Sequence, residues 1–136
     1  MNADNLKDLS KIRLERSKEL LADAEELLNH DSYKSANNRA FYAAEKAIKS
    51  VLSAIGKDSD SHVGVVRTFN IEFIHNPSDF FNREDLRIIQ SMDRIRNASD
   101  YDDFYIADKS ECAEQVKNAK YLIDKVEIFL KNNGIL

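Results

Sequence analysis

The sequence predicts an all-α protein, an antiparallel up-and-down helical bundle of four long helices plus one short helix. Apolar residues recur at helical spacing over most of the chain, and turn-forming residues are rare, with 3 glycines and 1 proline. The polar breaks between helical segments are brief, so that successive helices have to run antiparallel. At 136 residues the chain has the size of one domain, and we expect residues 1–136 to share one hydrophobic core.

Composition limits the classes of function. A net charge of −4 gives no general attraction for nucleic acid, so that contact with RNA needs a local basic patch. Cys112 is the single cysteine, which excludes an intrachain disulfide, and no regular ligand spacing marks a metal site. We therefore expect no metal and no cofactor. No apolar run approaches the roughly 20 residues of a membrane span, and the first ten residues do not resemble a signal peptide, which favours a cytoplasmic protein.

The first helix is expected over residues 6–28, which carry an apolar stripe at helical spacing made of Leu14, Leu21, Ala24 and Leu28. A polar break follows at residues 29–32, where Asp31 or Ser32 is able to cap the next helix. That next helix, residues 35–53, is the predicted centre of the bundle. Its buried arc consists largely of small side chains, which allow a neighbouring helix to come close: Ala36, Ala40, Ala43, Ala44 and Ala47.

Polar residues interrupt the surface of this central helix in a way that core filling does not explain. Asn37 falls inside the apolar arc, where an unpaired amide costs about 1 to 3 kcal/mol, so it needs a hydrogen-bond partner. Arg39, Tyr42 and Lys46 form a row at the edge of the arc. The row either faces a dimer partner or an anion, or its cations extend to water while the tyrosine ring rests on a neighbour.

Gly56 is expected to end the central helix, and Ser61 to cap the short helix that follows. His62 lies in the first turn of this short helix, where a packed or capping histidine is the usual finding. The helix is expected to end before the pair Asn76 and Pro77, since the residue that precedes a proline disfavours helical geometry.

The remaining segments are a turn at residues 77–85, whose Phe80 and Phe81 are expected to pin it to the bundle, and two long helices. The first runs through residues 86–101, and the second through residues 109–131, with Cys112 among its core residues.

Arg96 continues the core stripe of the helix at residues 86–101. A buried arginine needs a carboxylate, carbonyl oxygens or a bound anion, because an unpaired buried charge is too costly. Asp100, four residues further on, is the nearest candidate partner by spacing. The pair either ends the helix structurally or holds a guanidinium ready for a phosphate.

Three segments together resemble the HEPN family, and in particular its small stand-alone bacterial and archaeal members. Residues 36–43 are similar to the A-x-x-R-A-[YF]-Y-A signature of the second helix, residues 61–69 to the segment S-H-x-G-V-x3-F, and residues 96–101 to the R-x3-D-Y that ends the fourth long helix. The resemblance covers about residues 8–130. Each motif is weak by itself, and the three carry weight because they occur in order.

The resemblance implies a homodimer whose arginine motifs lie near a cleft between protomers. Many members are encoded beside a small nucleotidyltransferase and form a toxin-antitoxin pair, in which the HEPN protein is the toxin and cleaves RNA without a metal. It also implies site residues. The catalytic candidates are Arg96, Asp100 and Tyr101, and the candidates for binding nucleotide or RNA, or for lining the dimer cleft, are Asn37, Arg39, Tyr42 and His62.

The chain departs from the ribonuclease pattern R-x4-6-H at its histidine. The positions five to seven beyond Arg96 hold Tyr101, Asp102 and Asp103, and all three histidines come earlier in the sequence. A tyrosine with a pKa near 10 is a poor general base at neutral pH. Three hypotheses stay open: a ribonuclease toxin that uses Tyr101 or His62 for proton transfer, a non-catalytic module that binds a nucleotide, RNA or protein, and a helical scaffold.

Overall fold

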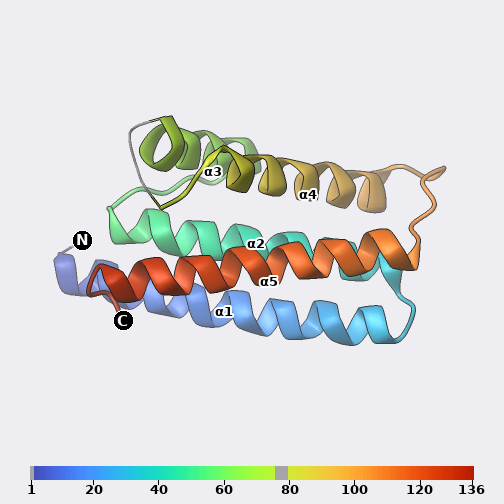
Figure 1. The fold of residues 1–136 in the computed structure, drawn as a ribbon, viewed down its shortest axis with the longest axis horizontal. Helices are drawn as coiled ribbons and strands as arrows, with labels where there is room; N and C mark the ends of the chain where they lie inside the picture. Colours follow the sequence, from blue (N-terminus) through green and yellow to red (C-terminus); the bar gives the residue numbers. More distant parts are fainter. Residues whose placement is uncertain (1, 76–79) are drawn as a thin grey trace.

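The computed structural model describes residues 2–75 and 80–136 and confirms the all-α fold class (Figure 1). The elements follow in the order α1 (Ala3–Asn29), α2 (Tyr33–Ala54), α3 (His62–Phe69), the π-helical turn η1 (Asn70–His75), α4 (Arg83–Tyr101) and α5 (Lys109–Asn132). The predicted boundary at residues 76 and 77, and the first part of the predicted turn, lie outside the described residues.

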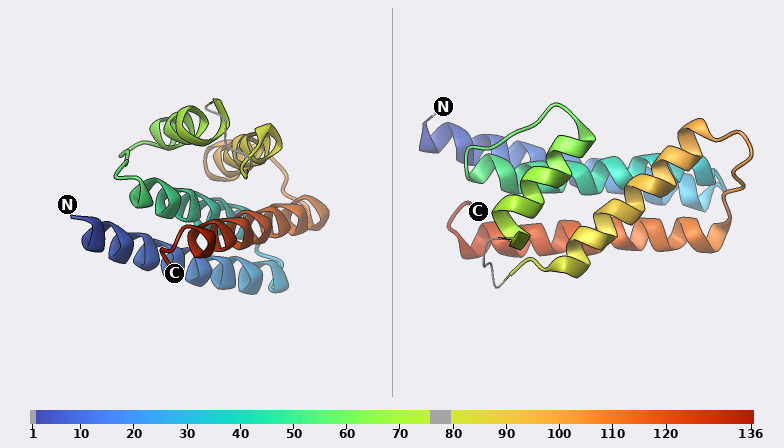
Figure 2. Two further views of the ribbon diagram at one scale, coloured as in Figure 1. Left: turned by 60° about the vertical axis from the view of Figure 1, so that its left-hand side comes forward. Right: turned by 90° about the horizontal axis from the view of Figure 1, so that it is seen from above.

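Helix α2 is at the centre, as expected, and contacts α1, α3, α4 and α5. The four long helices run up and down along the molecule, and both termini lie at the same end (Figure 1). Seen from above, α3 with η1, and α4, cross obliquely over the layer of α1, α2 and α5 (Figure 2). No helix within the described ranges has both the length and the apolar character needed to cross a membrane.

Local sequence explains most of the helix ends. Ser61 caps α3, because its hydroxyl accepts a hydrogen bond from the Gly64 amide at 3.0 Å, and Gly56 follows α2 with a φ of +72°, which a residue with a side chain rarely adopts. The expected side-chain cap of α2 is wrong. Ser32 occupies the capping position but its side chain makes no capping hydrogen bond, and the Asp31 carboxylate instead accepts from the Tyr33 hydroxyl at 3.0 Å.

Helices α1 and α2 pack at close range. Ala40, Ala43 and Ala47 are fully buried, and the Ser10 and Ser50 hydroxyls each donate to the other residue's backbone carbonyl at 2.6 Å. A side-chain hydroxyl reaches a carbonyl of a neighbouring helix only where the two backbones are near each other. The small residues of α2 therefore bring α1 close, as the sequence indicates.

Aromatic side chains fill the part of the core where α3, α5 and the segment before α4 meet. Phe81 is buried at 2% exposure, and its ring centroid lies 5.1 to 5.3 Å from those of Phe69, Phe80 and Phe129. The prediction that the adjacent phenylalanines pin their segment to the bundle is therefore confirmed.

Close packing at Ser50 makes a first prediction. Replacing Ser50 by Leu removes the reciprocal hydrogen bonds and inserts a much larger side chain between α1 and α2, so we expect a loss of about 1 to 3 kcal/mol in the free energy of unfolding. Urea denaturation followed by circular dichroism measures it. The same change at Ser110, an exposed residue of α5, is the matched control. Equal stability of the two variants would contradict the close approach.

Candidate functional site

Polar side chains join the first half of α2 to the last turn of α4. Asn37 is fully buried, and its amide nitrogen donates to the Ser99 hydroxyl at 3.1 Å, whereas its side-chain oxygen has no hydrogen-bond partner among the described residues. The amide of Asn38 donates to both carboxylate oxygens of Asp100, at 3.1 and 2.9 Å. Consecutive residues of α2 thus bind consecutive residues of α4, and this double contact fixes where the Asp100 carboxylate lies.

Arg96 is buried at 4% exposure, as the core stripe predicts. Its guanidinium donates to an Asp93 carboxylate oxygen at 2.7 Å and lies 3.7 Å from Asp100. The expectation that Asp100 is its nearest carboxylate is therefore wrong, because Asp93 one turn earlier points to the same side. The guanidinium also lies 5.2 Å from the centre of the Phe41 ring. Burial by itself lowers the pKa of Arg96, and the Asp93 hydrogen bond raises it above its ordinary value, so the side chain stays cationic.

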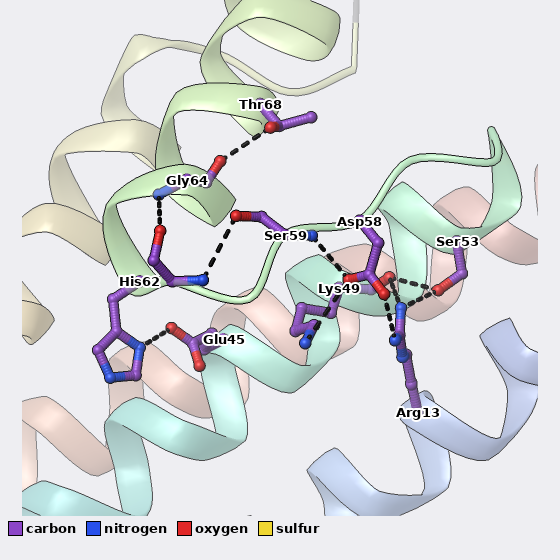
Figure 3. Close-up of polar contacts among 10 residues, drawn as sticks. Arg13, Glu45, Lys49, Ser53, Asp58, Ser59, His62, Gly64 and Thr68 are labelled. Atoms are coloured by element: carbon purple, nitrogen blue, oxygen red, sulfur yellow. Dashed lines mark hydrogen bonds and ion pairs between the residues drawn. The ribbon is translucent and has the colours of Figure 1, made fainter.

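His62 links α3 to α2. Its Nδ1 is hydrogen-bonded to the Glu45 carboxylate (Figure 3), and its ring packs edge-on against Phe41 at 5.4 Å and Tyr42 at 5.5 Å. His62 and Arg96 therefore both contact the Phe41 ring, which brings two of the predicted site residues into one neighbourhood. Burial is the main cause that raises the pKa of Tyr42, so its phenol is protonated at neutral pH.

Tyr101 is 76% exposed at the end of α4, with its ring centre 6.0 Å from the Arg96 guanidinium. The connection to α5 holds two further exposed apolar side chains, Phe104 at 94% and Ile106 at 87%. The backbone here is ordered by its own contacts, since the Phe104 amide donates to the Asp102 carboxylate at 3.0 Å. The structure thus presents three apolar side chains on an acidic connection.

Arg39 lies between two hollows of the surface. The polar hollow, of about 460 Å³, is lined by Leu27, Lys34, Ser35, Asn38, Arg39, Ser99 and Asp100. The basic hollow, of about 610 Å³, is lined by Arg16, Leu20, Asn38, Arg39, Tyr42, Glu45, Lys46 and Lys49. Arg39 is exposed and donates to the side-chain carbonyl of Asn38 at 2.8 Å. No carboxylate in the described part of the chain pairs with it.

The structure brings the predicted residues together around α2, although in two groups. Asn37, Asp100 and Arg96 belong to the contact between α2 and α4, whereas Tyr42 lines the basic hollow with Arg39. Lys34, Arg16 and Lys49 also line the hollows, and sequence reasoning missed all three. Their only signal was a positive charge on a predicted helix, for Arg16 and Lys49, or just before one, for Lys34, and many surface positions of a helical protein share that signal.

No cluster suited to a metal ion occurs within residues 2–75 and 80–136. Cys112 is fully buried, and burial raises the pKa of its thiol to about 11, which agrees with the predicted role as a core residue.

Comparison with known proteins gives three results. The family model for the HEPN domain matches residues 10–129. A UPF0332 protein from Thermotoga maritima is 27% identical over 117 residues, which cover 86% of this chain and 87% of that protein. The crystal structure of TT1696 from Thermus thermophilus is similar with a TM-score of 0.72 and 21% identity, over 87% of this chain and 95% of that one. The last likeness supports the fold alone.

The burial of Arg96 makes a second prediction. Replacing Arg96 by Ala leaves two neighbouring carboxylates without their cation, and we expect a loss of about 3 kcal/mol in the free energy of unfolding. Replacing the exposed Arg94 by Ala, two residues away on the same helix, is the control and should change the stability little. Chemical denaturation measures the stability of both variants. Equal unfolding midpoints would show that Arg96 does not stabilise the contact between α2 and α4.

Proposed function

This chain belongs to the HEPN domain family, and from this premise we propose that it is an RNA-binding toxin of a toxin-antitoxin pair, with a small nucleotidyltransferase as antitoxin. One observation carries the binding part. Arg39 is exposed between the polar and the basic hollow, and no described carboxylate neutralises it. A guanidinium in this state is suited to a phosphate, which it binds through two parallel hydrogen bonds.

The basic hollow supplies a local patch of positive charge in a chain whose net charge is negative. A chain with a charge of −4 needs a local basic patch to hold RNA. The lining of the hollow holds four cationic side chains from two helices, Arg16, Arg39, Lys46 and Lys49, and one carboxylate, Glu45, which is engaged by His62. Outside the lining, Arg16 lies 3.7 Å from Glu19 and Lys49 lies 3.6 Å from Asp58, so two of the cations are partly balanced. The local charge therefore favours a polyanion although the charge of the whole chain does not.

The connection from α4 to α5 supports the protein-protein part of the proposal. Tyr101, Phe104 and Ile106 are the three most exposed large apolar side chains of the described residues. Exposed apolar side chains held on an ordered backbone are suited to a protein interface, because little entropy is lost when they bind. We assign this connection to contact with the nucleotidyltransferase or with the second protomer of a homodimer.

Binding of RNA tests the proposal. Replacing Arg39 by Ala removes hydrogen bonds to a charged phosphate, worth about 1.4 kcal/mol, so we expect roughly tenfold weaker binding of a labelled single-stranded RNA. Fluorescence anisotropy of the purified protein measures it. Replacing Arg67 by Ala changes an exposed arginine of α3 that lines neither hollow, and it should leave the affinity unchanged. Equal affinities of the two variants would refute the assignment.

A second candidate function is metal-independent cleavage of RNA, and the placement of Arg96 beside Asp100 and Tyr101 favours it. In such a reaction the ribose 2′-hydroxyl loses its proton and attacks the phosphorus, and the 5′-oxygen leaves with a proton. Arg96 would stabilise the phosphate charge, and Asp100 would orient the Arg96 guanidinium. Tyr101 or His62 would transfer protons. Against it, Arg96 is already neutralised by carboxylates, and His62 is hydrogen-bonded to Glu45.

Cleavage of a mixed RNA pool in the presence of EDTA distinguishes the two functions. If the chain is a ribonuclease, the wild type cleaves and the Arg96→Lys variant loses at least about tenfold in rate, since lysine cannot make the paired hydrogen bonds of arginine. Tyr101→Phe then reports whether the phenol takes part. All variants are compared at equal thermal stability. If the wild type binds RNA without cleaving it, the cleavage function is refuted and only the binding function remains.

A further inference from the structure

Our inference concerns the length and the kind of ligand, and it rests on the proposed binding of RNA at Arg39. We propose that the site takes a single strand of several nucleotides, whose phosphates lie along α2 from Arg39 to Lys46 and Lys49 with Arg16 of α1 opposite, and not a mononucleotide.

The spacing of the cations along α2 sets the length. Arg39, Lys46 and Lys49 fall within about 80° of one another around the helix, so that they share one face. At a rise of about 1.5 Å per residue, the ten steps from Arg39 to Lys49 span about 15 Å. A stacked strand carries a phosphate about every 3.4 Å, and an extended one fewer, so this face accommodates roughly three to five phosphates. A mononucleotide is too short to reach all of these cations.

The charges in the basic hollow are incompletely balanced. Lys46 is half-buried and makes no ion pair with any residue that the structure describes. Lys49 lies 3.6 Å from Asp58, but that carboxylate is held at 2.9 Å by Arg13 (Figure 3). Burial, followed by the charges of Lys49 and Arg13, lowers the pKa of Lys46, so the cations repel one another. A row of phosphates relieves this repulsion and adds attraction.

Tyr42 favours an unpaired strand. Its half-buried side chain lines the basic hollow, and its position along α2 lies between those of Arg39 and Lys46. A base rests on such a ring only when it is free from its own helix, as in proteins that bind single strands. Paired bases are held in the duplex stack and are not free to stack on a tyrosine ring. The site should therefore prefer single-stranded over double-stranded RNA.

The charges beyond Arg39 limit how far the strand extends. The lining of the polar hollow sets the cations Lys34 and Arg39 beside the Asp100 carboxylate, and the following connection carries Asp102, Asp103 and Asp108. Positive charge is therefore denser toward Lys46 and Lys49 than toward this connection. The strand consequently extends from Arg39 toward Lys49.

Anisotropy titrations with 5′-labelled oligouridylates of two, four and eight nucleotides, at about 50 to 200 mM salt, test the inference. We expect the affinity to rise steeply from two to four nucleotides and to change little beyond. For about four phosphate contacts the logarithm of the binding constant should fall with that of the salt concentration with a slope of about −3, because each contact in a single strand contributes about −0.7.

The variants Lys46→Ala and Lys49→Ala should each make that slope less steep by about 0.7. Lys117→Ala, an exposed lysine of α5 outside the hollow, is the matched control and should leave it unchanged. Thermal denaturation verifies that the variants are folded.

The results separate this inference from the proposed function. The strand does not run along α2 if the dinucleotide binds as tightly as the longer strands, or if Lys46→Ala and Lys117→Ala give the same salt slope. In either case, weaker binding by the Arg39→Ala variant would still support the proposed RNA binding at Arg39. Equal affinity for a duplex of the same length would overturn the preference for a single strand. If Arg39→Ala has no effect either, both proposals are wrong.

Discussion

The close contact of α1 with α2 is the constraint on which the rest of the structure depends. The buried alanines of α2 and the reciprocal hydrogen bonds of Ser10 and Ser50 bring the two backbones together. Because this narrow face of α2 is covered by α1, side chains at its edge are directed into the groove between the two helices. Tyr42 and Lys46 thereby come to line the same hollow as Arg16 of α1.

The two arginines in the regions resembling family motifs have different surroundings, and the difference comes from desolvation. Arg96 is removed from water and is therefore compensated by Asp93, with Asp100 nearby. Arg39 remains in water, which solvates its charge, so no carboxylate is required. A ligand phosphate that binds Arg39 displaces only water, whereas one that binds Arg96 has to compete with an existing ion pair. This contrast is the physical reason for placing ligand binding at Arg39 rather than at Arg96.

Charge also divides the surface around the site into two regions. The basic hollow gathers cationic side chains, which favours the proposed polyanion, whereas the exposed apolar side chains of the connection from α4 to α5 are accompanied by Asp102, Asp103 and Asp108. The apolar side chains there are consequently suited to a protein surface and not to nucleic acid. Since Asp100 lines the polar hollow next to Arg39, a protein bound at the connection would lie beside the proposed strand.

The sequence by itself determined the helices, because each helix is a local structure whose apolar stripe, cap and terminating glycine are neighbours along the chain. Burial of Arg96, the cap at Ser61 and the central place of α2 all followed from such local patterns. The resemblance to HEPN proteins, which the family match supports, also came from short local motifs.

Only the tertiary structure decided which helices meet and which faces they share. The pairing of Asn38 with Asp100, and the presence of Arg16 opposite Lys46 and Lys49, join residues that are far apart in the chain. Helical periodicity predicts whether a side chain faces inward or outward. It does not predict which neighbouring residue the side chain contacts, because that contact depends on the distance and crossing angle between two helices. These follow from the packing of all side chains at once, and the basic hollow exists only as its result.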